Sequence, residues 1–327
     1  MICKVCGNNE NNKVHKAKEM MFGLNDSFDY LECGGCGCVQ IIDIPSDMSK
    51  YYPSKYYSLD VEQNKKHSLK KGLANFIFDN IHKRLNSFAY KNKGWLNKLL
   101  YKKFPYEISE AMRSLYLIKF KNKNARILDV GCGSGDFLQK LQYLGFKNLT
   151  GVDPFLKKDI YYESGVKIFK KYVTDLDGQY DLVTFHHSFE HIPNPLETLN
   201  AVEQLLPKGG LCLIRIPVAD SYAFTKYQTN WVEFDAPRHF FLHTLKSIEI
   251  LAQKAGLVLE DVIHDSTKFQ FMGSEQYLKG IPLTSSKSYL QGYKLNFTDN
   301  EIKEYEEKSK ELNILKKGGR AIFLLKK

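Results

Sequence analysis

A strand that ends in a glycine-rich turn is the strongest constraint on the fold of this 327-residue chain. In the string ILDVGCGSGDF, an apolar run reaches Gly131, Gly133 and Gly135 just before a helix-forming segment. Glycine allows tight turning there and lets a ligand approach the backbone closely. A second apolar run ends in Asp153, from which a carboxylate can accept both ribose hydroxyls of a nucleoside. Together with Asp129 in the first strand, these residues predict a nucleoside-binding pocket.

From Arg126 onward, apolar strands alternate with helical segments. Continuous apolar strands between helices are typical of a parallel sheet that is covered on both faces. We therefore predict an α/β fold with a doubly wound, seven-stranded, mostly parallel sheet in a domain spanning 124–327. The strands are expected at 125–131, 148–154, 166–169, 180–186, 210–218, 257–263 and 319–327. Residues 266–317, between the last two strands, form an insertion that is well placed to cover a substrate.

The residue at position 136 helps to choose the ligand. A dinucleotide fingerprint, GxGxxG, has its third glycine at that position, beside the pyrophosphate, but this chain has Asp136. A carboxylate would repel a pyrophosphate, whereas a cationic nucleoside would be attracted by Asp129 and Asp136. The sequence therefore favours a cationic nucleoside without phosphate over NAD.

The motifs resemble those of class I methyltransferases that use S-adenosylmethionine (SAM). LDVGCGSGDFL is similar to their first motif, GVDP to their second and YDLVTFHHSFEHIPNPLETL to their fourth, and LPKGGLCLIRIPV resembles the strand that follows. The resemblance implies a Rossmann-like methyltransferase fold. It also implies that Asp129, Gly131, Gly133 and Gly135 hold the methionine end of SAM and that Asp153 holds its ribose.

Four residues are candidates for catalysis. In HHSFEH, after the fourth strand, a helical turn would place His187, Glu190 and His191 on one face. A histidine could remove a proton from a hydroxyl acceptor while Glu190 orients it, and His239 in a later loop is a second candidate base. His191 could instead only cap the turn. HxxEH spacing also suits zinc at His187 and His191, although the sequence shows no third ligand.

The loop TNWVEFDAPRHFFLHT could form one wall of the acceptor pocket. Arg238 could pair with a phosphate or carboxylate on the acceptor. In the alternative interpretation, Trp231 and the phenylalanines simply pack the loop against the core. Together with EHIPNP, this loop resembles a bacterial group of methyltransferases that modify sugars, surface polysaccharides or secondary metabolites.

Two CxxC pairs at the start of the chain predict a zinc ribbon over residues 1–45. Four thiolates at this spacing can surround one structural Zn²⁺. The predicted ligands are Cys3, Cys6, Cys33 and Cys36. Such thiolates suit a reducing compartment, so we expect a cytoplasmic protein. Cys38, Cys132 and Cys212 are expected to be free thiols.

Residues 46–123 are rich in tyrosine and lysine and read as a helical connector or lid. Tyr51, Tyr52, Tyr56 and Tyr57 could present a hydroxyl to the acceptor. The formal charge of +10 fits an anionic partner, and no apolar run is long enough for a membrane span. Composition alone does not choose between a nucleic acid, a nucleotide-activated sugar and a membrane surface.

Three functions fit these observations. The favoured one is methyl transfer from SAM to a hydroxyl of a small acceptor, such as a sugar, a sugar nucleotide or a surface-glycan precursor. An RNA methyltransferase that uses the zinc ribbon to hold RNA is a second interpretation, although the fourth motif is not of the NPPY-like or catalytic-cysteine type. A SAM-binding regulator or scaffold without turnover is the third.

Overall fold

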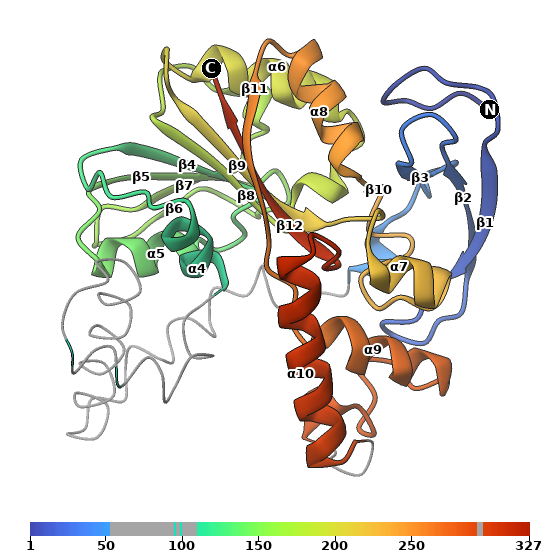
Figure 1. Cartoon of the computed structure of the whole chain (residues 1–327). Coiled ribbons are helices and arrows are strands. Elements are labelled where there is room, and N and C mark those ends of the chain that lie inside the picture. The colour runs from blue at the N-terminus through green and yellow to red at the C-terminus, as the bar shows by residue number, and fades with distance from the viewer. Residues whose placement is uncertain (53–94, 96–98, 100–109, 293–296) are drawn as a thin grey trace. The chain divides into compact units, whose positions relative to one another are not determined.

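The computed structural model describes residues 1–52, 95, 99, 110–292 and 297–327 (Figure 1). Its contacts divide the chain into two compact units. The cysteine unit contains Met1–Pro53, His187–Glu203 and Ile214–Lys326, and the glycine-turn unit contains Ser54–His186, Gln204–Leu213 and Lys327. The predicted connector at 46–123 falls largely outside the described residues, as do Tyr56 and Tyr57. No helix within the described ranges is long and apolar enough to cross a membrane.

The described strands confirm a mostly parallel Rossmann-like sheet, in the order β11-β12-β9-β8-β4-β5-β7-β6. It has eight strands, so the prediction of seven was wrong by one. All seven predicted strands are present, and the additional one is β6 (Ile160–Tyr161), which pairs antiparallel with β7 (Lys167–Phe169). Two residues are too few to produce a recognisable alternation of apolar and polar side chains.

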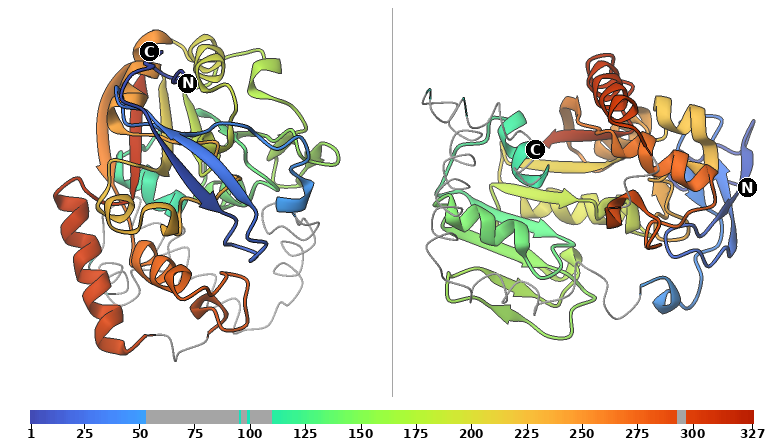
Figure 2. Two further views of the ribbon diagram at one scale, coloured as in Figure 1. Left: turned by 90° about the vertical axis from the view of Figure 1, so that its right-hand side faces the viewer. Right: turned by 90° about the horizontal axis from the view of Figure 1, so that it is seen from below.

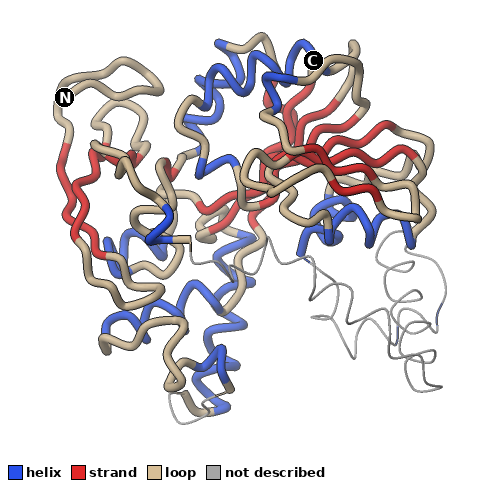
Figure 3. The backbone as a smooth tube through the Cα atoms, turned by 180° about the vertical axis from the view of Figure 1, so that it is seen from behind, coloured by secondary structure: helices blue, strands red, loops and turns tan. Residues whose placement is uncertain are grey.

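In the glycine-turn unit, β4 (Arg126–Val130) is the central strand. It pairs in parallel with β5 (Asn148–Val152) on one side and with β8 (Leu182–His186) on the other, and β5 pairs in parallel with β7. These strands are neighbouring red tubes in Figure 3. Their buried side chains are almost all apolar, which is why each strand reads as a continuous hydrophobic run.

Two helices of this unit lie against the same face of these strands, α4 (Glu110–Leu117) and α5 (Asp136–Tyr143) (Figure 1). Helix α5 begins directly after Gly135 and buries Phe137, Leu138 and Leu141. Because these three positions are spaced i, i+1 and i+4, they form one apolar stripe that faces the sheet. The short helix η2 (Val173–Asp175) follows β7.

The cysteine unit contains a second, antiparallel sheet in the order β1-β2-β3-β10. Its strands are β1 (Lys13–Lys18), β2 (Ser27–Glu32), β3 (Val39–Ile41) and β10 (Phe241–Leu242). Figure 2 shows β1 and β2 as a long blue hairpin. The fourth strand comes from a segment 200 residues further along the chain, so the N-terminal residues share one sheet with the loop that carries His239.

The remaining strands and helices of the cysteine unit follow β8 in the chain. Helix η3 (Phe189–His191) precedes α6 (Pro195–Leu205), and β9 (Leu211–Pro217) leads to α7 (Tyr222–Tyr227) and η4 (Gln228–Asn230). Helix α8 (Leu245–Lys254) is capped by Thr244, whose hydroxyl accepts a hydrogen bond from the Ser247 amide. It precedes β11 (Val258–His264), which pairs antiparallel with β12 (Arg320–Lys326).

The predicted insertion at 266–317 is mainly helical. It contains α9 (Phe269–Leu278), η5 (Tyr289–Gln291) and α10 (Asp299–Ile314). Helix α10 begins with a capping box between Thr298 and Glu301 and packs against α9 (Figure 2). A further short helix, η1 (Ser49–Tyr51), ends the described N-terminal segment.

Candidate functional site

The glycine-rich turn after β4 requires glycine at three positions. Gly131, Gly133 and Gly135 have φ angles of 71°, 53° and 81°, in the left-handed region that other residues rarely adopt. At Gly135, a Cβ atom would lie only 2.6 Å from the Cδ1 atom of Ile168. The turn is fixed to β5, because the Gly131 amide donates to the carbonyl oxygen of Val152 at 2.8 Å. An L-residue with a side chain would therefore strain this turn.

Two carboxylates lie beside this turn, at the carboxyl ends of neighbouring parallel strands. Asp129 is 3% exposed, and its Oδ1 accepts a hydrogen bond from the Thr184 hydroxyl at 2.8 Å. Asp153 accepts hydrogen bonds from the amides of Gly133 and Phe155, both at 2.9 Å. Neither carboxylate has a lysine or arginine partner among the described residues.

Burial controls the charge of both groups. It raises the pKa of Asp129 to about 7, against the opposing effect of the Thr184 hydrogen bond. Burial likewise raises the pKa of Asp153, and the two backbone amides that it accepts oppose this change. Asp136 differs, because it is exposed and forms an ion pair with Lys140 at 2.5 Å along α5. The buried acids of this turn are therefore Asp129 and Asp153, and Asp136 does not join them.

Glu190 lies at the centre of a second cluster, in the cysteine unit. Its side chain is fully buried, and neither carboxylate oxygen makes a hydrogen bond within the described part of the chain. Oε1 lies 3.4 Å from Nδ1 of His187 and 3.8 Å from Nε2 of His239. Burial raises the pKa of Glu190 to about 8, and the negative charge of Glu233 adds to this effect. Burying a carboxyl group without hydrogen bonds costs free energy of folding. Such a group is therefore a candidate for a functional role.

His187 is held by a buried ion pair that the sequence did not reveal. Asp265 accepts a hydrogen bond from Nε of Arg215 at 2.7 Å, and Nη1 of Arg215 donates to Nε2 of His187 at 2.6 Å. Because a guanidinium only donates, Nε2 of His187 must be the acceptor and its proton must lie on Nδ1, toward Glu190. The lone pair of His187 is therefore already in use, which argues against this residue as the general base.

His191 and His239 carry their proton on Nδ1, as His187 does. Nδ1 of His191 donates to the carbonyl oxygen of Arg238 at 2.7 Å, and Nδ1 of His239 donates to that of Glu233 at 2.9 Å. Each ring therefore keeps its lone pair on Nε2. Burial lowers the pKa of His191 and brings that of His239 to about 3, so both rings are neutral at pH 7. The hydroxyl of Tyr52 lies 3.3 Å from Nδ1 of His191.

Arg238 is a structural residue. It is fully buried and donates hydrogen bonds to Asp235, to Glu19 at 2.9 Å and to the carbonyl oxygen of Tyr51 at 3.2 Å. The expectation that it pairs with an anionic acceptor was therefore wrong, because its donors are already bound to protein acceptors. Trp231 is also fully buried, in agreement with the interpretation that the loop is packed against the core.

Replacing Arg238 with methionine should lower the free energy of unfolding by about 3–5 kcal/mol, because Glu19 and Asp235 would lose their buried partner. Urea denaturation would measure the change. The matched control is Arg126→Met, which removes an exposed ion pair with Asp181 and should cost at most about 1 kcal/mol. Equal losses in the two variants would contradict this structural role.

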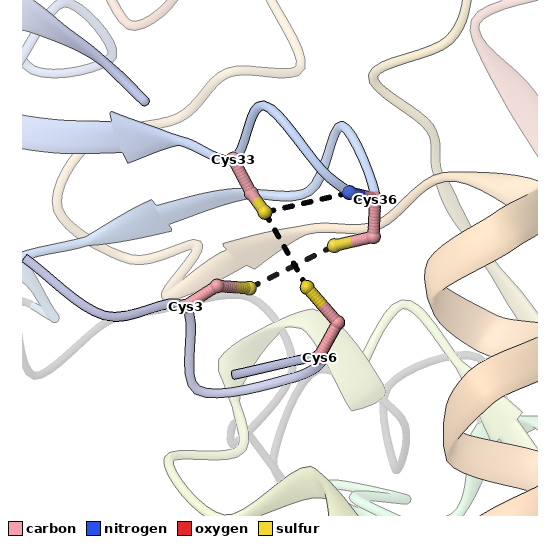
Figure 4. Close-up of side chains that lie close together, drawn as sticks. All are labelled: Cys3, Cys6, Cys33 and Cys36. Carbon is pink, nitrogen blue, oxygen red and sulfur yellow. Dashed lines mark hydrogen bonds between the residues drawn. The ribbon is translucent and has the colours of Figure 1, made fainter. Parts of the chain in front are cut away.

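The four N-terminal cysteines converge on one point (Figure 4). Their sulfur atoms all lie within 4.8 Å of one another, with Cys3 3.7 Å from Cys36 and Cys6 3.5 Å from Cys33. None forms a disulfide. Two backbone amides, of Gly35 and Cys36, donate to the sulfur of Cys33 at 3.3 and 3.4 Å. This arrangement presents four thiol groups to a single centre.

Helix α8 helps to hold these cysteine loops. The Thr244 hydroxyl donates to the carbonyl oxygen of Cys36 at 2.6 Å, and the ammonium groups of Lys246 and Lys254 donate to the carbonyls of Gly35 and Val5, both at 2.7 Å. The basic residues of α8 thus fix the positions of both CxxC loops.

The central part of the chain matches a known family. Residues 102–262 match a family model described as a methyltransferase domain. The ubiquinone biosynthesis O-methyltransferase of Pseudomonas aeruginosa (strain UCBPP-PA14) is 29% identical over 157 residues, which cover 42% of this chain and 66% of that protein. The enzyme of the same name from Xanthomonas euvesicatoria is 33% identical over 157 residues, or 42% of this chain and 64% of that protein. The match thus spans just under two thirds of these relatives' length.

The solved structures that the chain matches include two named as methyltransferases. A SAM-dependent methyltransferase from Archaeoglobus fulgidus is 20% identical with a TM-score of 0.41, covering 70% of this chain and 98% of that one. A possible histamine N-methyltransferase from Thermotoga maritima is 15% identical with a TM-score of 0.41, covering 74% of this chain and 99% of that one.

Proposed function

We propose, from the match of residues 102–262 to a methyltransferase domain, that the protein transfers a methyl group from SAM to a hydroxyl oxygen of a small-molecule acceptor. The observation that carries the proposal is the composition of two clusters, each described within its own unit. The glycine-turn unit offers the buried acids Asp129 and Asp153 to a cationic nucleoside, and the cysteine unit offers a buried carboxyl group and two neutral histidines to a hydroxyl group.

SAM fits the glycine-rich turn for an electrostatic reason. Asp129 and Asp153 are buried acids without a basic partner in the described ranges, and SAM carries an ammonium and a sulfonium group. In this proposal, Asp129 and the glycines Gly131, Gly133 and Gly135 hold the methionine end. Asp153 binds the ribose, since a carboxylate that accepts two amides still has free lone pairs for hydroxyl donors.

The raised pKa of Asp129 predicts that SAM binding depends on pH. A protonated Asp129 cannot pair with the ammonium of SAM, so affinity should rise as the pH increases through about 7. Between pH 6.0 and 7.5 the ionised fraction increases roughly eightfold, and the affinity should follow it. Isothermal titration calorimetry with SAM would measure this. The Asp129→Asn variant should bind more weakly and lose the dependence; a dependence that persists there would assign it to another group.

The second cluster would act on the acceptor. When bound, SAM supplies an electrophilic methyl group: the acceptor oxygen forms the new O–CH₃ bond, the S–CH₃ bond breaks, and S-adenosylhomocysteine leaves with the sulfur electron pair. The acceptor hydroxyl must also lose a proton. We propose Glu190, His191 and His239 as the groups that bind this hydroxyl and promote that loss. His187 would hold Glu190 in place, because its own lone pair accepts from Arg215.

A carbohydrate is the proposed class of acceptor. The support is the resemblance of EHIPNP and of the loop containing His239 to methyltransferases that modify sugars and surface polysaccharides. The relatives named for ubiquinone biosynthesis support a hydroxyl acceptor in general, and their similarity covers 42% of this chain. A phenolic hydroxyl is therefore the alternative.

The acceptor class can be tested directly. The full-length protein would be incubated with SAM and the small-molecule fraction of a bacterial extract, and S-adenosylhomocysteine would be followed together with metabolites that gain one methyl mass. A methylated sugar or sugar nucleotide would support the proposal. A methylated phenol would favour the alternative, a phenolic acceptor. If no small molecule gained a methyl group but RNA added in a parallel incubation did, the proposal of a small-molecule acceptor would be overturned.

A structural Zn²⁺ ion is the proposed occupant of the cysteine cluster. Zinc–sulfur bonds of about 2.3 Å in a tetrahedron place the sulfur atoms about 3.8 Å apart. The observed separations of 3.7 Å and 3.5 Å are close to this value. Amides that donate to sulfur, as at Cys33, stabilise a thiolate. Four protein ligands leave no open position, so this ion would stabilise the cysteine unit and take no part in catalysis.

A further inference from the structure

Glu190, His191 and His239 come together in a way that the sequence spacing does not suggest. One ligand atom from each residue lies within 4.8 Å of the other two, although His239 is 48 residues beyond His191 in the chain. Two histidines and one carboxylate are a common ligand set for zinc and for non-haem iron. We infer that these three residues bind one divalent first-row transition-metal ion, separate from the ion proposed for the cysteines.

The two histidines are oriented as metal ligands usually are. A ligating histidine typically donates its other ring N–H to a carbonyl or carboxylate, which fixes the ring and its tautomer. His191 and His239 both do so, to the carbonyl oxygens of Arg238 and Glu233. The nitrogen left with a lone pair in each ring is Nε2, and Nε2 of His239 lies 3.8 Å from Oε1 of Glu190.

The burial of Glu190 is an independent observation that favours a bound metal ion. Glu190 is fully buried, and among the described residues neither of its oxygens makes a hydrogen bond, although Nδ1 of His187 lies 3.4 Å from Oε1. A buried carboxyl group of this kind is costly without a partner, and a cation beside it would stabilise its ionised form. Its neighbours His191 and His239 turn their N–H groups away toward backbone carbonyls. A metal ion between the three residues would satisfy Glu190 and use both lone pairs.

The separations allow coordination after small movements. Bonds of about 2.0–2.2 Å place two ligand atoms roughly 3–3.5 Å apart, so the three side chains would each have to shift by about an ångström or less. His187 is not part of the set, because its Nε2 already accepts from Arg215. The HxxEH spacing had suggested His187 and His191 as ligands; His239 is the third residue that the spacing lacked.

Three protein ligands leave coordination positions open. Catalytic metal sites have this property, and their ions lower the pKa of a bound hydroxyl or water. Resting on the function proposed above, the open position would take the oxygen of the acceptor hydroxyl. The ion would supply a lowered pKa for that hydroxyl, so that its O–H bond would break with the proton released to solvent; the oxygen would form the O–CH₃ bond as the S–CH₃ bond of SAM breaks and S-adenosylhomocysteine leaves.

Cobalt(II) alone is a suitable probe, because four-thiolate sites give intense sulfur-to-cobalt charge-transfer bands and a site with nitrogen and oxygen ligands gives only weak ligand-field bands. The full-length protein, freed of metal with a chelator, should bind two Co²⁺ ions per chain, one with each spectrum. In His239→Asn, the ion with ligand-field bands should bind about 100-fold more weakly or not at all. The thiolate spectrum should stay unchanged, which shows that the variant is folded.

His15→Asn is the matched control, since His15 pairs with Glu32 away from this cluster and should leave both ions in place. Binding of one ion only, with the thiolate spectrum, would overturn the inference, as would a second ion that is unaffected by His239→Asn. Methyl transfer by a chain without the second ion would refute the metal and leave the proposed function intact. A second ion in a chain that methylates no hydroxyl would refute the function and leave the site.

Discussion

Glu190→Gln should lower kcat for methyl transfer by about 100-fold or more, while SAM binding stays unchanged. Glutamine has nearly the same shape, but its amide cannot ionise, so it cannot take part in removing the proton of the acceptor hydroxyl as a carboxyl group can. Loss of a group that promotes proton removal typically costs about 10²–10⁴ in rate. Steady-state formation of S-adenosylhomocysteine gives kcat, and calorimetry with SAM gives the affinity.

The control for this variant is Glu197→Gln. Glu197 is an exposed acid in the first turn of α6, seven residues beyond Glu190, and its replacement should leave kcat unchanged. A Glu190→Gln protein that turns over at the normal rate would remove the second cluster from the mechanism. An equal loss of SAM affinity in that variant would instead indicate a general structural defect.

Cys33→Ser should prevent the cysteine unit from folding stably. The binding free energy of structural zinc is on the order of 10 kcal/mol, which is comparable to the whole stability of a typical domain at about 5–15 kcal/mol. Cys33 also accepts the amides of Gly35 and Cys36, so the second CxxC loop would lose its organisation as well. Zinc content after dialysis against a weak chelator and the thermal unfolding midpoint would both fall.

Cys38→Ala tests whether any buried thiol of this region would show the same effect. Cys38 is buried two residues beyond Cys36 and lies outside the four-sulfur cluster, near His243 at 3.9 Å. Its replacement should keep the chelator-resistant zinc and should cost only the stability of a small buried side chain. If Cys33→Ser retained zinc as Cys38→Ala does, the proposed ligand set would be wrong.

The parallel sheet could be predicted because its signal is local. Strands such as Arg126–Val130 and Leu182–His186 are buried on both faces, so each appears in the sequence as an uninterrupted apolar run. Strand β6 is held by its pairing with β7 and has no such run. Glycines with positive φ were also predictable, since few other residues tolerate that conformation.

The candidate site was less predictable because its contacts join distant segments. Arg215 lies inside an otherwise apolar strand, which signals a buried charge but does not identify Asp265, 50 residues away, as its partner. The interpretation of Arg238 as an anion-binding residue failed for the same reason. Its partner Glu19 comes from the N-terminal segment, and no local pattern connects the two.

His239 shows how sequence and tertiary structure each contribute to the prediction of the site. Its position in a loop with several polar residues suggested a role, but nothing in the spacing placed it beside Glu190. Pairing of β10 with β3 and the hydrogen bond from the Phe240 amide to the Glu190 carbonyl oxygen bring the two residues together. The sequence thus supplied the residue types, and tertiary structure decided which of them share a cluster.

Transfer of a labelled methyl group tests the central claim most directly. SAM carrying a ¹³C-methyl group would be incubated with the full-length protein and an extract containing the acceptor, and the product would be observed by NMR. We predict a new signal with the chemical shift of an O–CH₃ group, equal in amount to the S-adenosylhomocysteine formed. Label that appears only as N–CH₃ or C–CH₃, or no transfer by a protein that binds SAM, would contradict the account.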